Sequence, residues 1–329
     1  MKAVVFGAGA TGARIARQLC SSAAFDAVEV RDPNQERLDR AVGSLGGLAT
    51  AGRGRRFSGG VDVAVIATPS GSQTALARKA VHAGVTTVTT SDDIDEVRNL
   101  LDLDQEARYG EIPVVVGAGF MPGLTCLLAR YAAQELDAID ELHVAKVGTG
   151  GPACARQHHR SLSSTALDWR DGRWTRRPGG SGRELAWFPD PVGGRDCYRA
   201  ALPDAVLLVR AFPGIDRITA RMAATRRDRL TAPLPMLRPP HAEGGVGAVR
   251  VEARGRVGKE RRVVVFGAVD RPAVAAGAVA AATAIHVATR DVEPGSVGLA
   301  SLADGRELLR DLAGRGVKAA RFEGTATFT

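Results

Sequence analysis

The sequence predicts an α/β fold, with a doubly wound parallel sheet at the amino end and, after it, a second α+β domain built on a mixed or antiparallel sheet. Two observations support the first part. Short runs rich in Val, Ile and Ala alternate with segments of helical apolar spacing over residues 1–122, and a glycine-rich turn follows the first of these runs directly. Parallel strands that are buried on both faces have this continuous apolar character, so helices are expected on both sides of the sheet.

The expected elements of the first domain follow one another as strand, helix, strand. Strands are expected at 2–6, 26–30, 61–68, 86–91 and 113–119, and helices at 13–19, 73–83 and 95–108. Ligands of such sheets bind at the carboxyl ends of the strands. This rule brings into one crevice the residues 7–12, 32, 67–70, 91–93 and 119–121.

The glycine-rich turn has the spacing GxGxxG between a strand and a helix, as GAGATG at 7–12. The first glycine allows a tight turn, the second lets the backbone approach a pyrophosphate, and the third lets the helix pack closely. The free N–H groups at the start of the helix then bind the anion. The pattern predicts a Rossmann dinucleotide-binding domain in which the pyrophosphate contacts Gly7, Gly9, Ala10, Thr11 and Gly12.

An acidic residue, Asp32, follows the second expected strand, about 20 residues past the last glycine. A carboxylate at this position binds the two hydroxyls of the adenosine ribose and repels a 2′-phosphate, so NAD is expected to be slightly preferred over NADP. Arg31 and Arg37 lie beside it and weaken that preference for NAD, because a guanidinium group can bind the 2′-phosphate of NADP. The other expected cofactor contacts are Ala67, Thr68, Pro69, Ser91, Gly119 and Phe120.

Three other classes of dehydrogenase do not fit. Short-chain dehydrogenases need a Lys four residues after a Tyr, and no tyrosine of this chain has one. The glucose–fructose oxidoreductase type has Glu-Lys-Pro where this chain has Thr90-Ser91-Asp92. Aldehyde dehydrogenases of the glyceraldehyde-phosphate type need a Cys nucleophile beside a His base. Cys126 lies in an apolar helical pattern, where a buried and inert thiol is expected.

Three motifs together give a resemblance to a known family: GATG near the amino end, an acid after the second strand, and GAGFMPGL at 117–124 opening the next helix. The sequence resembles the saccharopine dehydrogenase family of NAD(P)-dependent oxidoreductases over roughly residues 1–135. The resemblance implies a Rossmann domain, a middle mixed sheet that binds substrate and makes a dimer, and a carboxyl-terminal helix that returns to the first domain. It also implies hydride transfer at a carbon–nitrogen bond. Family members have Asp before the Pro-Gly of the third motif, whereas this chain has Met121, so the amino-acid substrate does not follow from the resemblance.

The expected domain organisation is a Rossmann domain of residues 1–122 with a returning part, 271–329, and a substrate-binding and dimerisation domain, 123–270. In the second domain we expect a helix at 155–169, turns and loops at 169–182 and 189–198, a loop at 233–245, and a strand pair at 248–255 and 261–269. Strands are also expected at 141–147 and 216–223, and helices near 203–209 and at 271–290.

His158 and His159 are the candidate catalytic residues. They are adjacent on an expected helix that follows a Gly-rich loop at a strand end, and the pKa range of His suits acid–base chemistry near neutrality. Neighbouring residues of a helix point about 100° apart, so at least one of the two is expected to be packed or solvated. The candidate substrate-binding residues are Met121, Arg156 and Arg160, of which the arginines suit a carboxylate.

The composition of the chain restricts the kinds of binding partner that we expect. The net charge is +8, and its Arg residues are scattered along a chain with only 5% aromatic residues, so a nucleic-acid partner is not expected. The four cysteines form no CxxC pair, which predicts neither a metal site nor disulfides and fits a reducing cytoplasm. No apolar run reaches the length of a membrane span, and no signal-peptide core is present. A small-molecule substrate and a homodimer are expected.

Two functions remain open from the sequence. The first is an NAD(P)-dependent oxidoreductase that transfers hydride at an amine, imine or keto centre of a small amino-acid-like substrate. The alternative is a non-catalytic sensor or partner protein that binds a dinucleotide. Met121 and the lack of a clear acid–base pair favour the sensor, while the intact glycine loop and the large second domain favour the enzyme.

Overall fold

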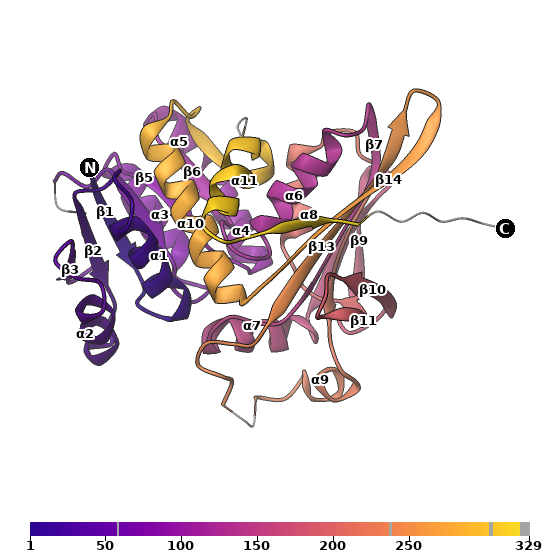
Figure 1. The fold of residues 1–329 in the computed structure, drawn as a ribbon, viewed down its shortest axis with the longest axis horizontal. Coiled ribbons are helices and arrows are strands. Elements are labelled where there is room, and N and C mark those ends of the chain that lie inside the picture. Colours follow the sequence, from indigo (N-terminus) through magenta and orange to yellow (C-terminus); the bar gives the residue numbers. More distant parts are fainter. Residues whose placement is uncertain (58, 237–238, 303–304, 323–329) are drawn as a thin grey trace.

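The computed structural model describes residues 1–57, 59–236, 239–302 and 305–322. Within these residues the strands form two sheets, which lie side by side and are joined by helices (Figure 1). The amino-terminal part of the chain makes most of one sheet, and the middle of the chain makes the other.

The first sheet is parallel and has the order β3-β2-β1-β4-β5-β6-β15. Its strands are β1 (Lys2–Phe6), β2 (Ala27–Arg31), β3 (Ala49–Gly52), β4 (Val63–Ile66), β5 (Thr86–Thr89), β6 (Pro113–Val116) and β15 (Gly295–Gly298). The chain runs outward from β1 on one side and from β4 on the other, so a topological switch point lies between these strands, where such sheets bind ligands. The expected doubly wound parallel sheet is confirmed.

The helices around the first sheet are α1 (Ala10–Cys20), α2 (Gln35–Gly43), α3 (Gln73–His82), α4 (Ile94–Leu101), α5 (Asp104–Tyr109), α10 (Pro272–Thr289) and α11 (Gly305–Gly314). Helix α10 is long and apolar enough to cross a membrane, but 78% of it is buried inside the protein. It packs against α1, β4 and β5, and it returns to the amino-terminal end of the molecule (Figure 1). The expected helix at 271–290 is therefore a core helix.

The second sheet is mixed and follows the path β10-β11-β12-β7-β13-β14-β16, with β8 paired to β12 and β9. The β7–β12 pair is parallel and the other pairs are antiparallel. The strands are β7 (Ala138–Val147), β8 (Thr165–Arg170), β9 (Arg173–Pro178), β10 (Glu184–Phe188), β11 (Gly193–Arg199), β12 (Arg217–Ala223), β13 (Gly247–Val257), β14 (Glu260–Asp270) and β16 (Ala319–Arg321). The associated helices are α6 (Leu124–Ala133), α7 (Pro152–Ser161), α8 (Asp204–Ala211), α9 (Arg226–Thr231) and the 3-10 turn η1 (Leu299–Ser301). The buried α6 follows β6 of the first sheet in the chain and packs against β7, β13 and β14 of the second.

The expected helix at 155–169 is wrong in its second half, because α7 ends at Ser161 and β8 begins at Thr165. The hydroxyls of Ser163 and Ser164 both donate to the Arg160 carbonyl, which belongs to the last turn of α7. Serine side chains that bond to the backbone in this way compete with helix continuation. The residues that follow are drawn into the sheet, where β8 pairs with β12 and β9.

Two segments expected to be turns and loops form strands instead. Residues 169–182 contain most of a β8–β9 hairpin, whose turn has positive φ at Asp171 (50°) and Gly172 (75°). An Asp-Gly pair with this geometry is a strong hairpin indicator, and it was available in the sequence. Residues 189–198 include most of β11, which pairs with β10 and β12.

The expected and observed elements also differ in smaller ways, mainly where an element packs against residues distant in the sequence. The single helix expected at 95–108 is two helices, α4 and α5, because the chain turns at Asp102 so that α5 packs against β15. Several short elements were not predicted from the sequence, namely β3, β15, β16, α2, α9 and α11. The expected loop at 233–245 is irregular where it is described, and positions 237 and 238 lie outside the described residues.

The carboxyl-terminal part contributes to both sheets. After α10, β15 joins β6 at the edge of the first sheet, and β16 then pairs with β14 of the second sheet. Within the expected returning part, 271–329, positions 303–304 and 323–329 lie outside the described residues. The boundaries at 122 and 270 stay a prediction.

Replacing Gly12 by Ala is expected to destabilise the fold. An added Cβ would lie 1.8 Å from the Gly7 carbonyl oxygen, so the start of α1 would have to move away from the glycine loop. Overpacking of this kind costs roughly 1–3 kcal/mol of the free energy of unfolding, measured by urea titration. Gly314→Ala is the control, since a Cβ there meets nothing within 4 Å. Equal stability of the two variants would contradict this packing role.

Candidate functional site

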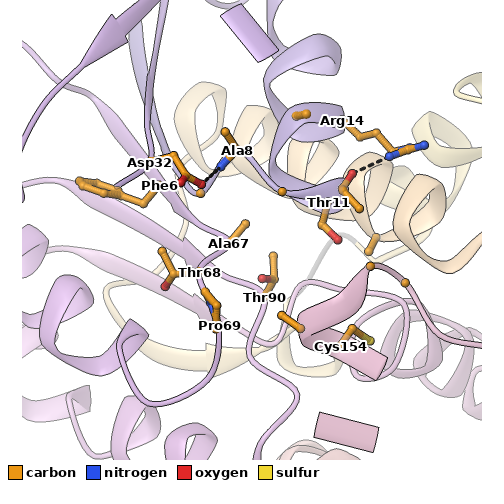
Figure 2. A pocket seen from close by; sticks show the side chains of 18 of the residues that line it. Phe6, Ala8, Thr11, Arg14, Asp32, Ala67, Thr68, Pro69, Thr90 and Cys154 are labelled. Atoms are coloured by element: carbon orange, nitrogen blue, oxygen red, sulfur yellow. Dashed lines mark hydrogen bonds between the residues drawn. The ribbon is translucent and has the colours of Figure 1, made fainter. Parts of the chain in front are cut away.

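A cavity of about 1530 Å³ lies at the carboxyl ends of the central strands of the first sheet. The glycine loop, the strand-end loops and the start of α7 form its walls. Figure 2 shows Asp32, Ala8 and Thr11 on one side of this space, with Thr68, Pro69, Thr90 and Cys154 on the other. Residues of both sheets therefore meet in one cavity.

The glycine loop passes from β1 into α1 along this cavity. Gly7, Gly9, Ala10 and Thr11 line it, and Gly9 is the N-cap residue of α1. The first N–H groups of a helix have no partner within the helix, so they are free for an anion. Gly12 is buried beneath the loop against Gly7 and does not line the cavity. Its place is that of the third glycine of the motif, which allows close packing.

Asp32 follows β2 and is held in a fixed orientation. One carboxylate oxygen accepts the Ala8 N–H at 2.7 Å and the other accepts the Asn34 N–H at 2.8 Å. Arg37 lies 3.6 Å from the carboxylate, with half of its side chain exposed. The neighbouring Arg31 is engaged elsewhere, because its guanidinium pairs with Glu29 at 2.6 Å. Of the two arginines expected to weaken a preference for NAD, only Arg37 is therefore available.

The loops after β4, β5 and β6 supply the floor of the cavity. Most of the residues expected there line it, namely Ala67, Thr68, Pro69, Gly119, Phe120 and Met121. Ser91 does not: it is fully buried and its hydroxyl donates to Glu96. Its neighbours Thr90 and Asp92 line the cavity instead.

The turn that carries Met121 is compact. The Gly119 N–H donates to the Pro122 carbonyl at 3.0 Å, and the Leu124 N–H donates to the Gly119 carbonyl at 2.9 Å. Gly123 has a φ of 125°, and a Cβ there would lie 2.3 Å from the Gly119 nitrogen. The glycines of this motif therefore allow a tight turn that presents Phe120 and Met121 to the cavity.

The opposite wall comes from the second sheet. Strand β7 ends at Val147, a Gly-rich stretch follows, and α7 begins beside α1, where a Cβ on Gly151 would lie 2.8 Å from the Ala10 side chain. Arg156, His158 and Arg160 of α7 line the cavity, the two arginines being exposed. His159 does not line it, because its ring bonds to the Leu234 carbonyl at 2.9 Å on the other side of the helix.

His158 belongs to a cluster of four ionisable side chains, which we call the α7 cluster: Asp92, Lys146, Cys154 and His158. The Nε2 atom of His158 lies 3.3 Å from the Asp92 carboxylate, 3.4 Å from the Cys154 sulfur, and within hydrogen-bond distance of the Lys146 ammonium. Lys146 is only 1% exposed, in a strand flanked by β12 and β13. All four residues line the cavity.

The members of the α7 cluster shift one another's pKa values. Burial raises the pKa of Asp92, but the hydrogen bond to His158 and the charges of His158 and Lys146 outweigh it, so the pKa lies below its usual value. Burial and the charge of Lys146 lower the pKa of His158, but its interactions with Cys154 and Asp92 raise it, and the net shift is upward. The surroundings therefore lower the pKa of the carboxyl group and raise the pKa of the imidazole.

Three members of the cluster have the atom types of a metal site. Among the described residues Asp92, Cys154 and His158 place one possible ligand atom each within 4.8 Å of one another. The ammonium of Lys146 already provides a positive charge at this point, directly against His158. A divalent cation would have to displace it or bear its repulsion, so the donor set does not fit a metal while Lys146 is charged.

Lys146 and Cys154 were not predicted as site residues from the sequence, and Asp92 was predicted only as part of the crevice at the strand ends. Cys154 and His158 are four residues apart on one helix, a spacing that puts both on the same face. That spacing was a usable indication. For Lys146, the only indication was a single lysine between the apolar residues at the end of an expected strand.

A second buried carboxyl group lies behind the cluster. Asp204 is completely buried, and Thr125 donates to one of its oxygens at 2.6 Å, while the other oxygen has no partner among the described residues. Burial raises its pKa to about 6, although the bond from Thr125 and the charge of Lys146 oppose the shift.

Comparisons with solved structures agree with this architecture. No family model matches the chain. Apo saccharopine dehydrogenase (L-Glu forming) from Saccharomyces cerevisiae is similar to 98% of this chain over 100% of its own, with a TM-score of 0.71 and 13% identity. GenD2 from gentamicin A biosynthesis, in complex with NAD, matches 98% of the chain over 97% of its own with a TM-score of 0.49 and 11% identity, too low to support an argument. The resemblance found in the sequence is therefore confirmed at the level of the fold.

Replacing Asp204 by Asn is expected to change how stability depends on pH. The carboxyl group binds its proton more tightly in the folded protein, with a pKa of about 6, than its usual value of 3.8 allows in the unfolded chain. The free energy of unfolding of the wild type should therefore fall as the pH rises through this interval, and Asp204→Asn should remove that fall. Between about pH 4 and about pH 7 the variant should gain on the order of 3 kcal/mol over the wild type in urea unfolding.

Asp95→Asn is the control for this comparison, since the side chain of Asp95 is 89% exposed. Its stability should follow the wild-type pH profile. If the curves for Asp204→Asn and the wild type run parallel, the carboxyl group of Asp204 does not titrate in this interval.

Proposed function

We propose that the protein is an NAD(P)-dependent oxidoreductase of the saccharopine dehydrogenase type, which transfers hydride at a C–N or keto centre of a small, amino-acid-like substrate. One observation carries the proposal: a single cavity joins a dinucleotide-binding loop to a buried cluster suited to proton transfer. Hydride transfer to or from such a centre also moves a proton, so an enzyme of this kind needs both parts together.

The residues of the first sheet fit a nicotinamide dinucleotide. The N–H groups at the start of α1 would hold its pyrophosphate, and Asp32 would accept the hydroxyls of its adenosine ribose. When bound, the cofactor supplies the hydride acceptor or donor. NAD is the preferred form in this proposal, because the carboxylate of Asp32 would repel a 2′-phosphate and the charge of the neighbouring Arg31 is engaged by Glu29.

His158 is the proposed proton carrier. Its imidazole faces the cavity with Asp92 and Lys146 on the same ring nitrogen, so a proton can be held at Nε2. Lys146 lies in strand β7 and Asp92 lies in the short connection between β5 and α4, so both position the ring. A proton donor of fixed orientation is what general acid catalysis requires.

Arg156 and Arg160 are the proposed anchors for a substrate carboxylate. Both are exposed at the cavity wall on the same helix as His158. The Arg160 guanidinium also donates to the Gln157 side chain at 2.8 Å, which fixes its direction. Met121 adds an apolar surface to the floor in place of the family's acid, which favours a substrate without an ammonium group at that point.

An alternative function and a homodimeric assembly also belong to the proposal. A non-catalytic sensor remains the alternative function, favoured by the absence of an acid at position 121.

A homodimer through the second sheet is supported by the outer face of the edge strand β10, where Leu185 is 59% and Trp187 is 62% exposed. A cytoplasmic location stays a prediction.

Gly9→Val tests the cofactor site. A Cβ at Gly9 meets nothing within 4 Å and would project toward the cavity, so the fold should be retained while the cofactor is obstructed. We expect at least about a tenfold loss of NADH affinity in a fluorescence titration. Gly314→Val, which also meets open space but does not line the cavity, should bind as the wild type does. Unchanged affinity in Gly9→Val would exclude the loop as the pyrophosphate site.

His158→Asn tests the proton carrier against its neighbour. Turnover with an active member of a panel of amino and keto acids should fall by about 10² or more, because Asn cannot carry the proton, while NADH affinity stays the same. His159→Asn is the matched control on the same helix, and its turnover should change by less than about twofold, since its ring lies outside the cavity. Equal effects of the two substitutions would remove His158 from the mechanism.

A further inference from the structure

Cys154 is the member of the α7 cluster that proton transfer alone does not use. It is the third residue of α7, it is partly exposed, and its sulfur lies 3.4 Å from His158 Nε2. We propose that Cys154 is a covalent nucleophile and that the enzyme oxidises aldehydes to carboxylic acids through a thioester on this residue. The inference rests on the proposed function, because it needs the dinucleotide bound in the same cavity.

The four cysteines differ sharply in their surroundings. Cys126 and Cys197 are fully buried, and burial raises the pKa of both thiols, that of Cys197 to about 12. Cys20 is partly exposed on α1 but does not line the cavity, and burial raises its pKa as well. Cys154 lines the cavity beside the His158 imidazole, so the pair of Cys and His that the sequence around Cys126 did not offer is present here. Of these thiols it alone combines access to a substrate with an adjacent base.

The Cys154 sulfur has a helix N-terminus and a group able to take its proton beside it. The residue sits in the first turn of a ten-residue helix, where the free N–H groups carry partial positive charge. His158 is directly adjacent, and the Lys146 ammonium contacts the same ring. Moving the thiol proton from Cys154 to His158 produces an anion and a cation in contact, with the Asp92 carboxylate and the Lys146 ammonium both beside the same ring nitrogen. This is the arrangement that activates cysteine nucleophiles.

The reaction balances with the groups present and one dinucleotide. The Cys154 sulfur forms a bond to the aldehyde carbon, its proton passes to His158, and the carbonyl oxygen becomes a hydroxyl by taking that proton. The C–H bond then breaks as hydride moves to NAD⁺, which is reduced to NADH, while the hydroxyl proton returns to His158 and a thioester remains. Water adds its oxygen to the thioester carbon and a proton to the sulfur, the C–S bond breaks, and the carboxylic acid leaves as the thiol is restored. The proton held by His158 passes to the solvent.

The chemistry selects an aldehyde. After a thiol adds to a carbonyl group, a hydrogen must remain on that carbon for hydride transfer to follow, and only an aldehyde carbon has one. Arg156 lies two residues beyond Cys154 at the cavity wall, and Arg160 lies on the same helix. An aldehyde that also carries a carboxylate therefore fits better than an uncharged one.

The experiment follows NADH formation from NAD⁺ with succinic semialdehyde as the probe and propanal as its uncharged counterpart. The wild type should oxidise succinic semialdehyde at least about tenfold faster, and intact-protein mass spectrometry of quenched samples should find the acyl adduct on Cys154. Cys154→Ser should lose aldehyde oxidation and the adduct by about 10² or more while still binding NADH. Cys20→Ser should behave as the wild type does.

Alkylation supplies a readout that needs no substrate. Near neutral pH, iodoacetamide should label Cys154 at least about tenfold faster than Cys20, and His158→Asn should abolish the difference. Labelling of Cys154 no faster than of Cys20, or aldehyde oxidation that survives in Cys154→Ser, would overturn the covalent role. Lack of oxidation of either aldehyde by a wild type that binds NADH would overturn it too and leave the proposed function standing. Lack of NADH binding would instead refute the proposed function.

Discussion

Two side-chain contacts hold helix α7 against the end of strand β5, and the candidate site depends on them. The His158 ring meets the Asp92 carboxylate at 3.3 Å, and the Gln157 amide donates to the Asp93 carboxylate at 2.7 Å. Asp93 is also the N-cap of α4, so the helix of one unit is joined to a fixed point of the other. Without this docking, the glycine loop and the α7 cluster would not face one cavity.

The cost of this arrangement is electrostatic. Lys146, Asp92 and His158 are removed from most of the solvent, and Asp204 is buried behind them with one oxygen unpartnered. Buried charges cost folding free energy unless they pair closely, and a structural core of the same volume would be more stable if it were apolar. Proteins concentrate groups of this kind at functional sites, where their altered pKa values are useful. The burial of Lys146 in a central strand, where an apolar residue would pack more easily, is the strongest indication that the cavity has a chemical role.

How much could be predicted from the sequence depended on whether the determining contacts were local. The glycine loop, the carboxylate of Asp32 and the parallel strands follow from short motifs and apolar runs, and they occur where they were expected. Strand β8 did not, because its pairing with β12 and β9 outweighs the helical appearance of the sequence. The α7 cluster depends on a contact between β5, β7 and α7, which no local pattern specifies.

The central claim is that the nicotinamide ring lies against the α7 cluster, so the most direct measurement is a crystal structure with NAD⁺ bound. The account predicts the pyrophosphate at the start of α1 and the nicotinamide C4 atom facing Cys154 and His158, leaving room for a substrate carbon about 3–3.5 Å from each reacting atom. A nicotinamide ring turned away from α7, with protein atoms filling the space between C4 and His158, would contradict it.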